Sequence, residues 1–235
     1  MRFARMLRQD IRYQIKYGFY FLYTFMSALY IGILLLLPMD VRPVGAALII
    51  LTDPAMLGFF FIGGIWLLEK AEGLHRFWSV LPAAPVEYIL SKVLSLVLIS
   101  TLSGVLIAST ARAGNPNFLR LCIAIILGAG IFTLGGLTLA TWARSVNHYL
   151  LITVPVELAL LLPPTLMTFG IRHPLLTFFP GAQLYQAFCF SLGLATEMDG
   201  FRIFAGLLFW LVVALSLALL RVPIALREGG TGGWE

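Results

Sequence analysis

Charged residues are scarce in this chain: Asp, Glu, Lys and Arg make up 11% of its 235 residues, whereas 60% are hydrophobic. Soluble globular domains carry about 25% charged residues, so the composition excludes an ordinary soluble domain. Cysteine is scarce too, and Cys122 and Cys189 lie in separate apolar regions without metal-binding or redox spacing. The sequence therefore predicts an integral membrane protein without cysteine-based chemistry.

Catalytic motifs are missing from the sequence. It contains no HExxH metal-binding pair, no GxSxG elbow and no GxxxxGK[ST] phosphate-binding loop. The chain is therefore not expected to be an enzyme, to hold a metal or to split ATP by itself. The net charge of +5 is spread among hydrophobic runs rather than clustered on one face, so nucleic acid is not an expected partner.

Long hydrophobic runs occupy most of the sequence, and six of them are near the ~20 residues that cross a bilayer as a helix. We expect an all-α polytopic membrane protein whose transmembrane domain covers 18–222. The six expected spans are 18–37, 44–68, 88–110, 119–143, 147–170 and 203–222.

Both ends of the chain differ from this hydrophobic domain. Residues 1–17 place Phe3, Leu7 and Ile11 on one stripe among basic residues, which predicts an amphipathic helix lying on anionic membrane lipids. Residues 223–235 are rich in glycine and predict a flexible cytoplasmic tail.

The distribution of Lys and Arg among the loops predicts the orientation of the chain in the membrane. With both termini inside, eleven of them fall on the cytoplasmic side and five on the outer side. Positive residues favour the cytoplasmic side. We expect a multi-pass protein of the plasma or inner membrane with both termini in the cytoplasm.

A polar connector, 69–87, joins the second and third expected spans on the cytoplasmic side. Leu74, Phe77 and Trp78 recur at helical spacing before Pro82, which indicates a short amphipathic helix that ends at the proline. Such a helix outside the bilayer suits contact with a soluble partner.

The stretch 171–201 is apolar but broken by proline and glycine. It predicts one or two half-inserted or surface helices on the outer side, packed on protein rather than lipid. Pro163-Pro164 should break the fifth span near its outer end, either as part of a gate or as an early helix stop. The candidate gate residues are Pro163, Pro164, Pro180 and Gly181.

Two carboxylates fall inside expected spans. Glu157 lies near the middle of the fifth span, and Asp53 precedes Pro54 in the outer half of the second. Ionisable groups in the membrane are functional candidates because each costs several kcal/mol unless it has a partner. We consider both as candidate substrate-pathway residues. The alternatives are packing carboxyls and, for Asp53, a cap at a proline kink.

Three stretches carry a family resemblance: Asp10–Tyr20, Asp53–Phe61, and the connector with Glu69–Gly73, Leu81-Pro82, Pro85, Tyr88 and Ser91-Lys92. They resemble the ABC-2 type transporter permeases, and most of all the small permease subunits of the fluoroquinolone-export type. Ala71 stands where the family's acidic run offers a further glutamate.

The resemblance implies a half-transporter. Two permease chains, identical or different, would pair around a pathway, each resting on a separate ABC ATP-binding subunit that holds ATP and magnesium. The connector would be the coupling helix, the N-terminal helix a second contact, and 171–200 outer re-entrant helices. The implied coupling residues are Glu69, Lys70, Glu72, Gly73, Arg76, Phe77, Leu81 and Pro82.

The expected function is therefore ATP-driven export of a hydrophobic or amphiphilic compound, such as a drug or lipid. A lipid-, haem- or polysaccharide-exporting permease remains an alternative within the same superfamily. From another class, a membrane-embedded enzyme or a non-transporting assembly factor is the alternative.

Overall fold

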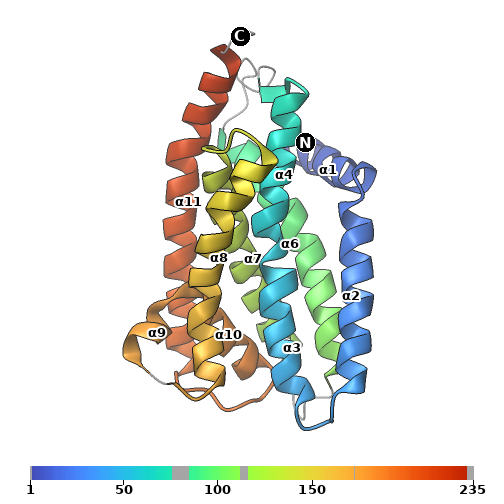
Figure 1. Ribbon diagram of the computed structural model, residues 1–235, viewed down its shortest axis with the longest axis vertical. Coiled ribbons are helices and arrows are strands. Elements are labelled where there is room, and N and C mark those ends of the chain that lie inside the picture. The colour runs from blue at the N-terminus through green and yellow to red at the C-terminus, as the bar shows by residue number, and fades with distance from the viewer. Residues whose placement is uncertain (1, 76–84, 112–115, 172, 232–235) are drawn as a thin grey trace.

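The computed structural model describes residues 2–75, 85–111, 116–171 and 173–231, and these residues form helices joined by short turns (Figure 1). Arg76, Phe77, Leu81 and Pro82 of the connector lie outside the described residues. The helices are α1 (Arg2–Lys16), α2 (Phe19–Leu36), α3 (Arg42–Ile50), the π-helical segment η1 (Leu51–Ala55), α4 (Leu57–Ala71), α6 (Pro85–Thr110), α7 (Phe118–Ala140), α8 (Val146–Thr168), α9 (Pro174–Phe178), α10 (Pro180–Ser191) and α11 (Gly200–Thr231).

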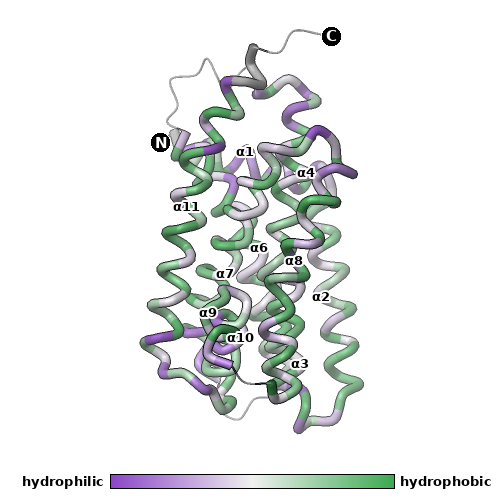
Figure 2. The backbone as a smooth tube through the Cα atoms, turned by 60° about the vertical axis from the view of Figure 1, so that its left-hand side comes forward, coloured by the Kyte–Doolittle hydropathy of each residue, from purple (hydrophilic) through white to green (hydrophobic). Residues whose placement is uncertain are grey.

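Among the residues that the structure describes, six helices are long and apolar enough to cross a membrane, which confirms the expected all-α architecture. They are α2, the continuous α3–η1–α4 rod (Arg42–Ala71), α6, α7, α8 and α11. Figure 1 shows them side by side, with both termini at one end of the bundle and α9 and α10 at the other. Hydrophobic residues run along their middles, and hydrophilic residues gather towards the two ends (Figure 2).

Helix α7 forms the centre of the bundle, where it packs against α4, α6 and α11. Glycine permits the closest of these contacts. A Cβ atom at Gly136 would lie 2.3 Å from the carbonyl oxygen of Phe59, so α4 and α7 meet backbone to backbone. The hydroxyl of Tyr149 on α8 donates to that same carbonyl and to the Gly136 carbonyl at 3.2 Å. Tyr149 therefore joins α8 to both α4 and α7.

Helix α1 lies across the end of the bundle that carries the termini (Figure 1) and packs on α6 and α2. The chain turns from α1 into α2 at Gly18, whose φ of 79° lies in the left-handed region that favours glycine. The helix expected at the N-terminus is thus present, while its position on a membrane surface stays a prediction.

At the opposite end, the broken stretch forms the short helix α9 and the longer α10. Almost every residue of α10 is buried, and it packs against α11, α8, α7 and α3. A break of the fifth span at Pro163-Pro164 is not found, because α8 continues through both prolines to Thr168. The prolines remove two backbone donors, yet packing against α10 keeps the helix intact.

Candidate functional site

A buried ionic network joins α1, α4 and α6 just inside the end of the bundle that carries the termini. The Lys92 ammonium lies 2.5 Å from Asp10 Oδ1 and also bonds Glu69 Oε1. The hydroxyl of Tyr88 donates to Glu69 Oε2 at 2.7 Å, and the hydroxyl of Ser91 donates to Asp10 Oδ2. Lys92 is 2% exposed and Glu69 is 3% exposed, so water reaches neither charge. The ion pairs and hydrogen bonds of the network therefore replace the lost hydration of these groups.

Further hydrogen bonds extend this network along α1. The Gln14 side-chain amide donates to Ser95 Oγ at 2.6 Å, and Ser95 in turn donates to the Lys92 carbonyl at 2.8 Å. Beyond the bundle, the Tyr17 hydroxyl donates to Glu72 in the connector. Helix α1 is therefore fastened both to α6 and to the start of the connector.

The end of α4 sets the direction in which the connector leaves the bundle. Gly73 has a φ of 72°, and its amide donates to the Lys70 carbonyl at 3.1 Å, which closes the helix. Lys70, Glu72 and Gly73 are exposed, whereas Glu69 faces the interior. Of the described coupling candidates, three are thus available to a partner and Glu69 acts inside the subunit.

His75 turns the chain back onto α4. Its ring is buried and lies against Trp66, with ring centroids 4.2 Å apart, and Trp66 in turn meets the Tyr88 ring. Burial, followed by the nearby positive charges of Lys70 and Lys92, lowers the pKa of His75 to about 4. The beginning of the connector is therefore held by a neutral imidazole packed on Trp66 of α4.

Asp53 lies in η1, inside the second span. This π-helical turn carries Pro54, whose missing N–H disturbs the regular helix, and π-turns are frequent at functional sites. The carboxyl of Asp53 is 5% exposed and interacts with the Tyr30 hydroxyl of α2. Among the described residues, its Oδ2 has no hydrogen-bond partner. The helix bulges at Asp53-Pro54 and continues, rather than being capped there.

The candidate gate residues meet between α8 and α10. A Cβ atom at Gly181 would lie 2.1 Å from the Leu160 carbonyl oxygen and 3.6 Å from Pro164 Cγ. Pro164 has no N–H to donate to that carbonyl four residues earlier, which leaves the oxygen free for the close approach. Pro180 begins α10 beside them. The structure thus brings the proline pair of α8 against the start of α10.

An apolar cavity of about 490 Å³ lies between α7, α8 and α11. Val156 and Leu160 of α8 line it, but Glu157 between them does not. Glu157 is half-buried on a helix that is mostly exposed. The two candidate pathway carboxylates are on different helices, and no described contact joins them.

The family model described as the fluoroquinolones export permease protein family matches residues 1–225. The chain belongs to this family. Fluoroquinolones export permease proteins of two Mycobacterium tuberculosis strains, CDC 1551 / Oshkosh and ATCC 25618 / H37Rv, are each 28% identical to it over 172 residues, covering 72% of this chain and 71% of each relative. The chain is thus a multi-pass permease of an export family, as the sequence resemblance implied.

The pairing of Asp10 with Lys92 is not predicted by the sequence alone. The relevant pattern is present, because Asp10 lies in the first stretch that carries the resemblance, while Glu69 and Lys92 lie in the connector stretch where it meets the two flanking apolar runs. Opposite charges at such margins offset each other when the helices pack, so they are candidates for pairing. Eighty-two positions separate Asp10 from Lys92, and only the fold brings them together.

Proposed function

We propose that the chain is the membrane-spanning permease subunit of an ATP-driven exporter. A separate ABC ATP-binding subunit, with ATP and magnesium, would hold the connector 69–87, and a second permease chain would complete the pathway. The proposal places both termini and the connector in the cytoplasm, in agreement with the distribution of Lys and Arg.

The ionic network of Asp10, Glu69 and Lys92 is the observation that carries this proposal. It makes the N-terminal helix and the two spans that flank the connector into one mechanical unit. A pull on the connector would therefore move α4 and α6 together as rigid bodies instead of unwinding the end of either helix. The exposed Lys70, Glu72 and Gly73 lie where a soluble subunit could reach them.

The cargo is proposed to be a hydrophobic or amphiphilic compound. The two mycobacterial relatives are named for fluoroquinolone export, and the described spans of this chain present mostly apolar side chains. Glu157 and Asp53 would favour cationic compounds. Glu157→Gln and Asp53→Asn should each reduce export of a cationic dye while sparing a neutral one, and equal export of both by wild type and variants would remove this role.

Coupling can be tested at Gly73 with a matched pair of variants. Gly73→Val disfavours the left-handed backbone by about 1–2 kcal/mol, whereas asparagine adopts this conformation more readily. With the ATP-binding subunit coexpressed, Gly73→Val should insert normally but export severalfold less per ATP hydrolysed, and Gly73→Asn should stay close to wild type.

A charge reversal at Lys70 tests the same contact without altering the backbone. Lys70→Glu should weaken association with the ATP-binding subunit, whereas Arg202→Glu, on the exposed start of α11 at the other end, should not. Undiminished export and association in both Gly73→Val and Lys70→Glu proteins would contradict the coupling role.

A further inference from the structure

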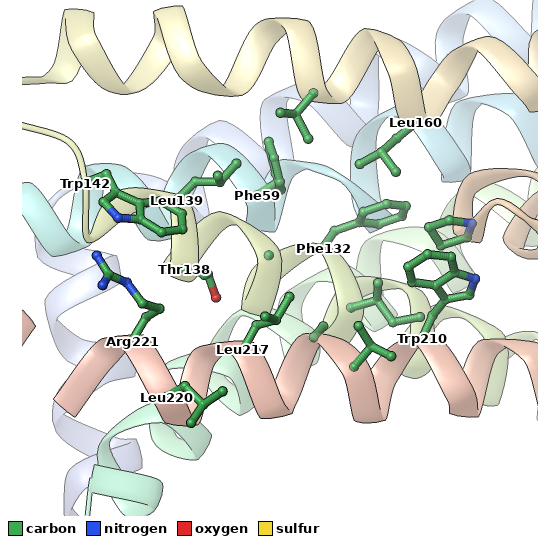
Figure 3. Close-up of a pocket in the computed structure, with 16 residues that line it drawn as sticks. Phe59, Phe132, Thr138, Leu139, Trp142, Leu160, Trp210, Leu217, Leu220 and Arg221 are labelled. Atoms are coloured by element: carbon green, nitrogen blue, oxygen red, sulfur yellow. The ribbon is translucent and has the colours of Figure 1, made fainter. Parts of the chain in front are cut away.

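The apolar cavity between α7, α8 and α11 has the form of a groove that runs along one helix. Its residues on α11 extend from Trp210 to Arg221, a rise of about 16 Å at 1.5 Å per residue. This is about half of the ~30 Å hydrocarbon thickness of a bilayer. Figure 3 shows Arg221 and Trp142 at one end of the groove and Trp210 at the other. The groove therefore spans about one leaflet.

The two ends of the groove differ in chemistry. At the end nearer the termini, the Arg221 guanidinium lies over the Trp142 ring at 4.7 Å from its centroid. Arg221 Nε is buried without a hydrogen-bond partner, and none of the carboxylates whose side chains are described pairs with this arginine. At the other end, Trp210 donates to the Phe178 carbonyl at 2.9 Å, and Pro180 closes the groove. One end thus carries a cation that no carboxylate with a described side chain pairs with, and the other is sealed by protein.

The groove opens sideways, towards the surroundings of the bundle. Trp142, Leu217 and Leu220 line it and are 47%, 49% and 65% exposed. Between its ends the lining is almost wholly apolar, with the Thr138 hydroxyl already bonded to the Leu134 carbonyl at 2.9 Å. An occupant therefore needs a long apolar part that enters from the bilayer and an anionic group at the interface.

We propose that this groove binds one anionic phospholipid from the leaflet on the side of the two termini. An acyl chain lies along α7 and α11, and the lipid phosphate accepts hydrogen bonds from Arg221. Arginine presents a planar fork of donors that matches phosphate oxygens, and basic pockets between membrane helices bind lipid head groups. Tryptophan is enriched at the level of the head groups, which is where Trp142 would then lie.

Native mass spectrometry of the purified chain can test this site with phosphatidylglycerol and phosphatidylcholine of identical acyl chains. Both lipids carry a phosphate, but the choline cation offsets its charge in phosphatidylcholine. Wild type should therefore retain phosphatidylglycerol about fivefold more strongly, the effect expected for one arginine at a head group of net negative charge. Arg221→Gln should abolish the preference, and Arg221→Lys should keep part of it. Arg144→Gln removes an exposed arginine at the same end but outside the groove, and should behave as wild type.

A second variant fills the groove while keeping its cation. A Cβ atom at Gly135 would meet only Phe59, at 3.6 Å, so a larger side chain has room chiefly in the groove. Gly135→Leu should lower retention of both lipids, with Arg221 unchanged.

The proposal is overturned if wild type shows no preference for phosphatidylglycerol, or if Arg221→Gln retains the preference. It is also overturned if Gly135→Leu and Arg221→Gln abolish binding of an amphiphilic drug or formation of a dimer while leaving lipid retention intact. The measurement uses neither ATP nor transport, so its failure would leave the proposed export function standing.

Discussion

Different interactions hold the helices together at the two ends of the bundle. At the end that carries the termini, α1, α4 and α6 are joined by buried charges on Asp10, Glu69 and Lys92. At the opposite end, α8 and α10 are joined by close backbone contact between Leu160 and Gly181. Charges fix a particular arrangement, because each loses its solvation if a partner leaves, whereas apolar packing restrains shape alone. The ionic end should thus be sensitive to changes of charge, and the packed end to changes of side-chain volume.

The largest expected effect comes from breaking the ionic end. Lys92→Met leaves two buried carboxylates without their cation and should lower the free energy of unfolding by about 3–5 kcal/mol. Unfolding of the purified chain in mixed micelles, followed by circular dichroism as denaturing detergent is added, would measure the loss.

A compensating variant separates this charge effect from loss of the lysine stem. Adding Asp10→Asn and Glu69→Gln to Lys92→Met removes the unpaired charges and should recover most of the stability. If Lys92→Met by itself is as stable as wild type, the ionic network does not hold this end together.

The packed end should respond to volume rather than charge. Gly181→Ala places a Cβ atom 2.1 Å from the Leu160 carbonyl oxygen, so α10 must move, at a cost of roughly 1–3 kcal/mol. Gly64→Ala is the control, because a Cβ atom there has no neighbour within 4 Å. Equal unfolding free energies for the two alanine variants, under the same micelle conditions, would argue against a tight α8–α10 contact.

The smallest expected effect is a pH dependence of the unfolding free energy, which arises from His75 at the ionic end. The folded protein holds the pKa of His75 at about 4, below its usual 6.5, because burial disfavours the imidazolium. The stabilising contribution of the neutral imidazole is therefore complete above pH 6.5 and declines as the pH falls towards 4, since only the unfolded chain binds the proton. At pH 5.5 the loss should be about 1 kcal/mol.

His75→Phe keeps a ring against Trp66 but cannot titrate. Comparing its unfolding at pH 7.5 and 5.5 with that of wild type removes the contribution of carboxylates common to both proteins. Identical pH dependence in the two proteins would show that His75 does not titrate in this window.

Much of the architecture could be predicted because membrane spans are local in sequence. The six hydrophobic runs match the six membrane-length helices of the described part of the chain, and the broken stretch 171–201 contains the short helices α9 and α10. The helix break that the sequence predicts at Pro163-Pro164 is absent for a tertiary reason: α10 packs Gly181 on the carbonyl that Pro164 leaves free. Likewise Asp53-Pro54 gave a π-turn within a continuous rod, which neighbouring helices stabilise.

The site was predicted in pieces. The three stretches that carry the resemblance could be found from the sequence. The ion pairs that join residues 10, 69 and 92 could not be predicted, and neither could the apolar groove that has Arg221 at one end. Hydrophobic run length and the distribution of positive charge determined the membrane class, the number of spans and the expected orientation, because these depend on transfer from water to lipid residue by residue. Which charges meet, which way Glu69 faces and where a groove is left between helices were decided by tertiary packing alone, because they depend on the rotation and approach of whole helices.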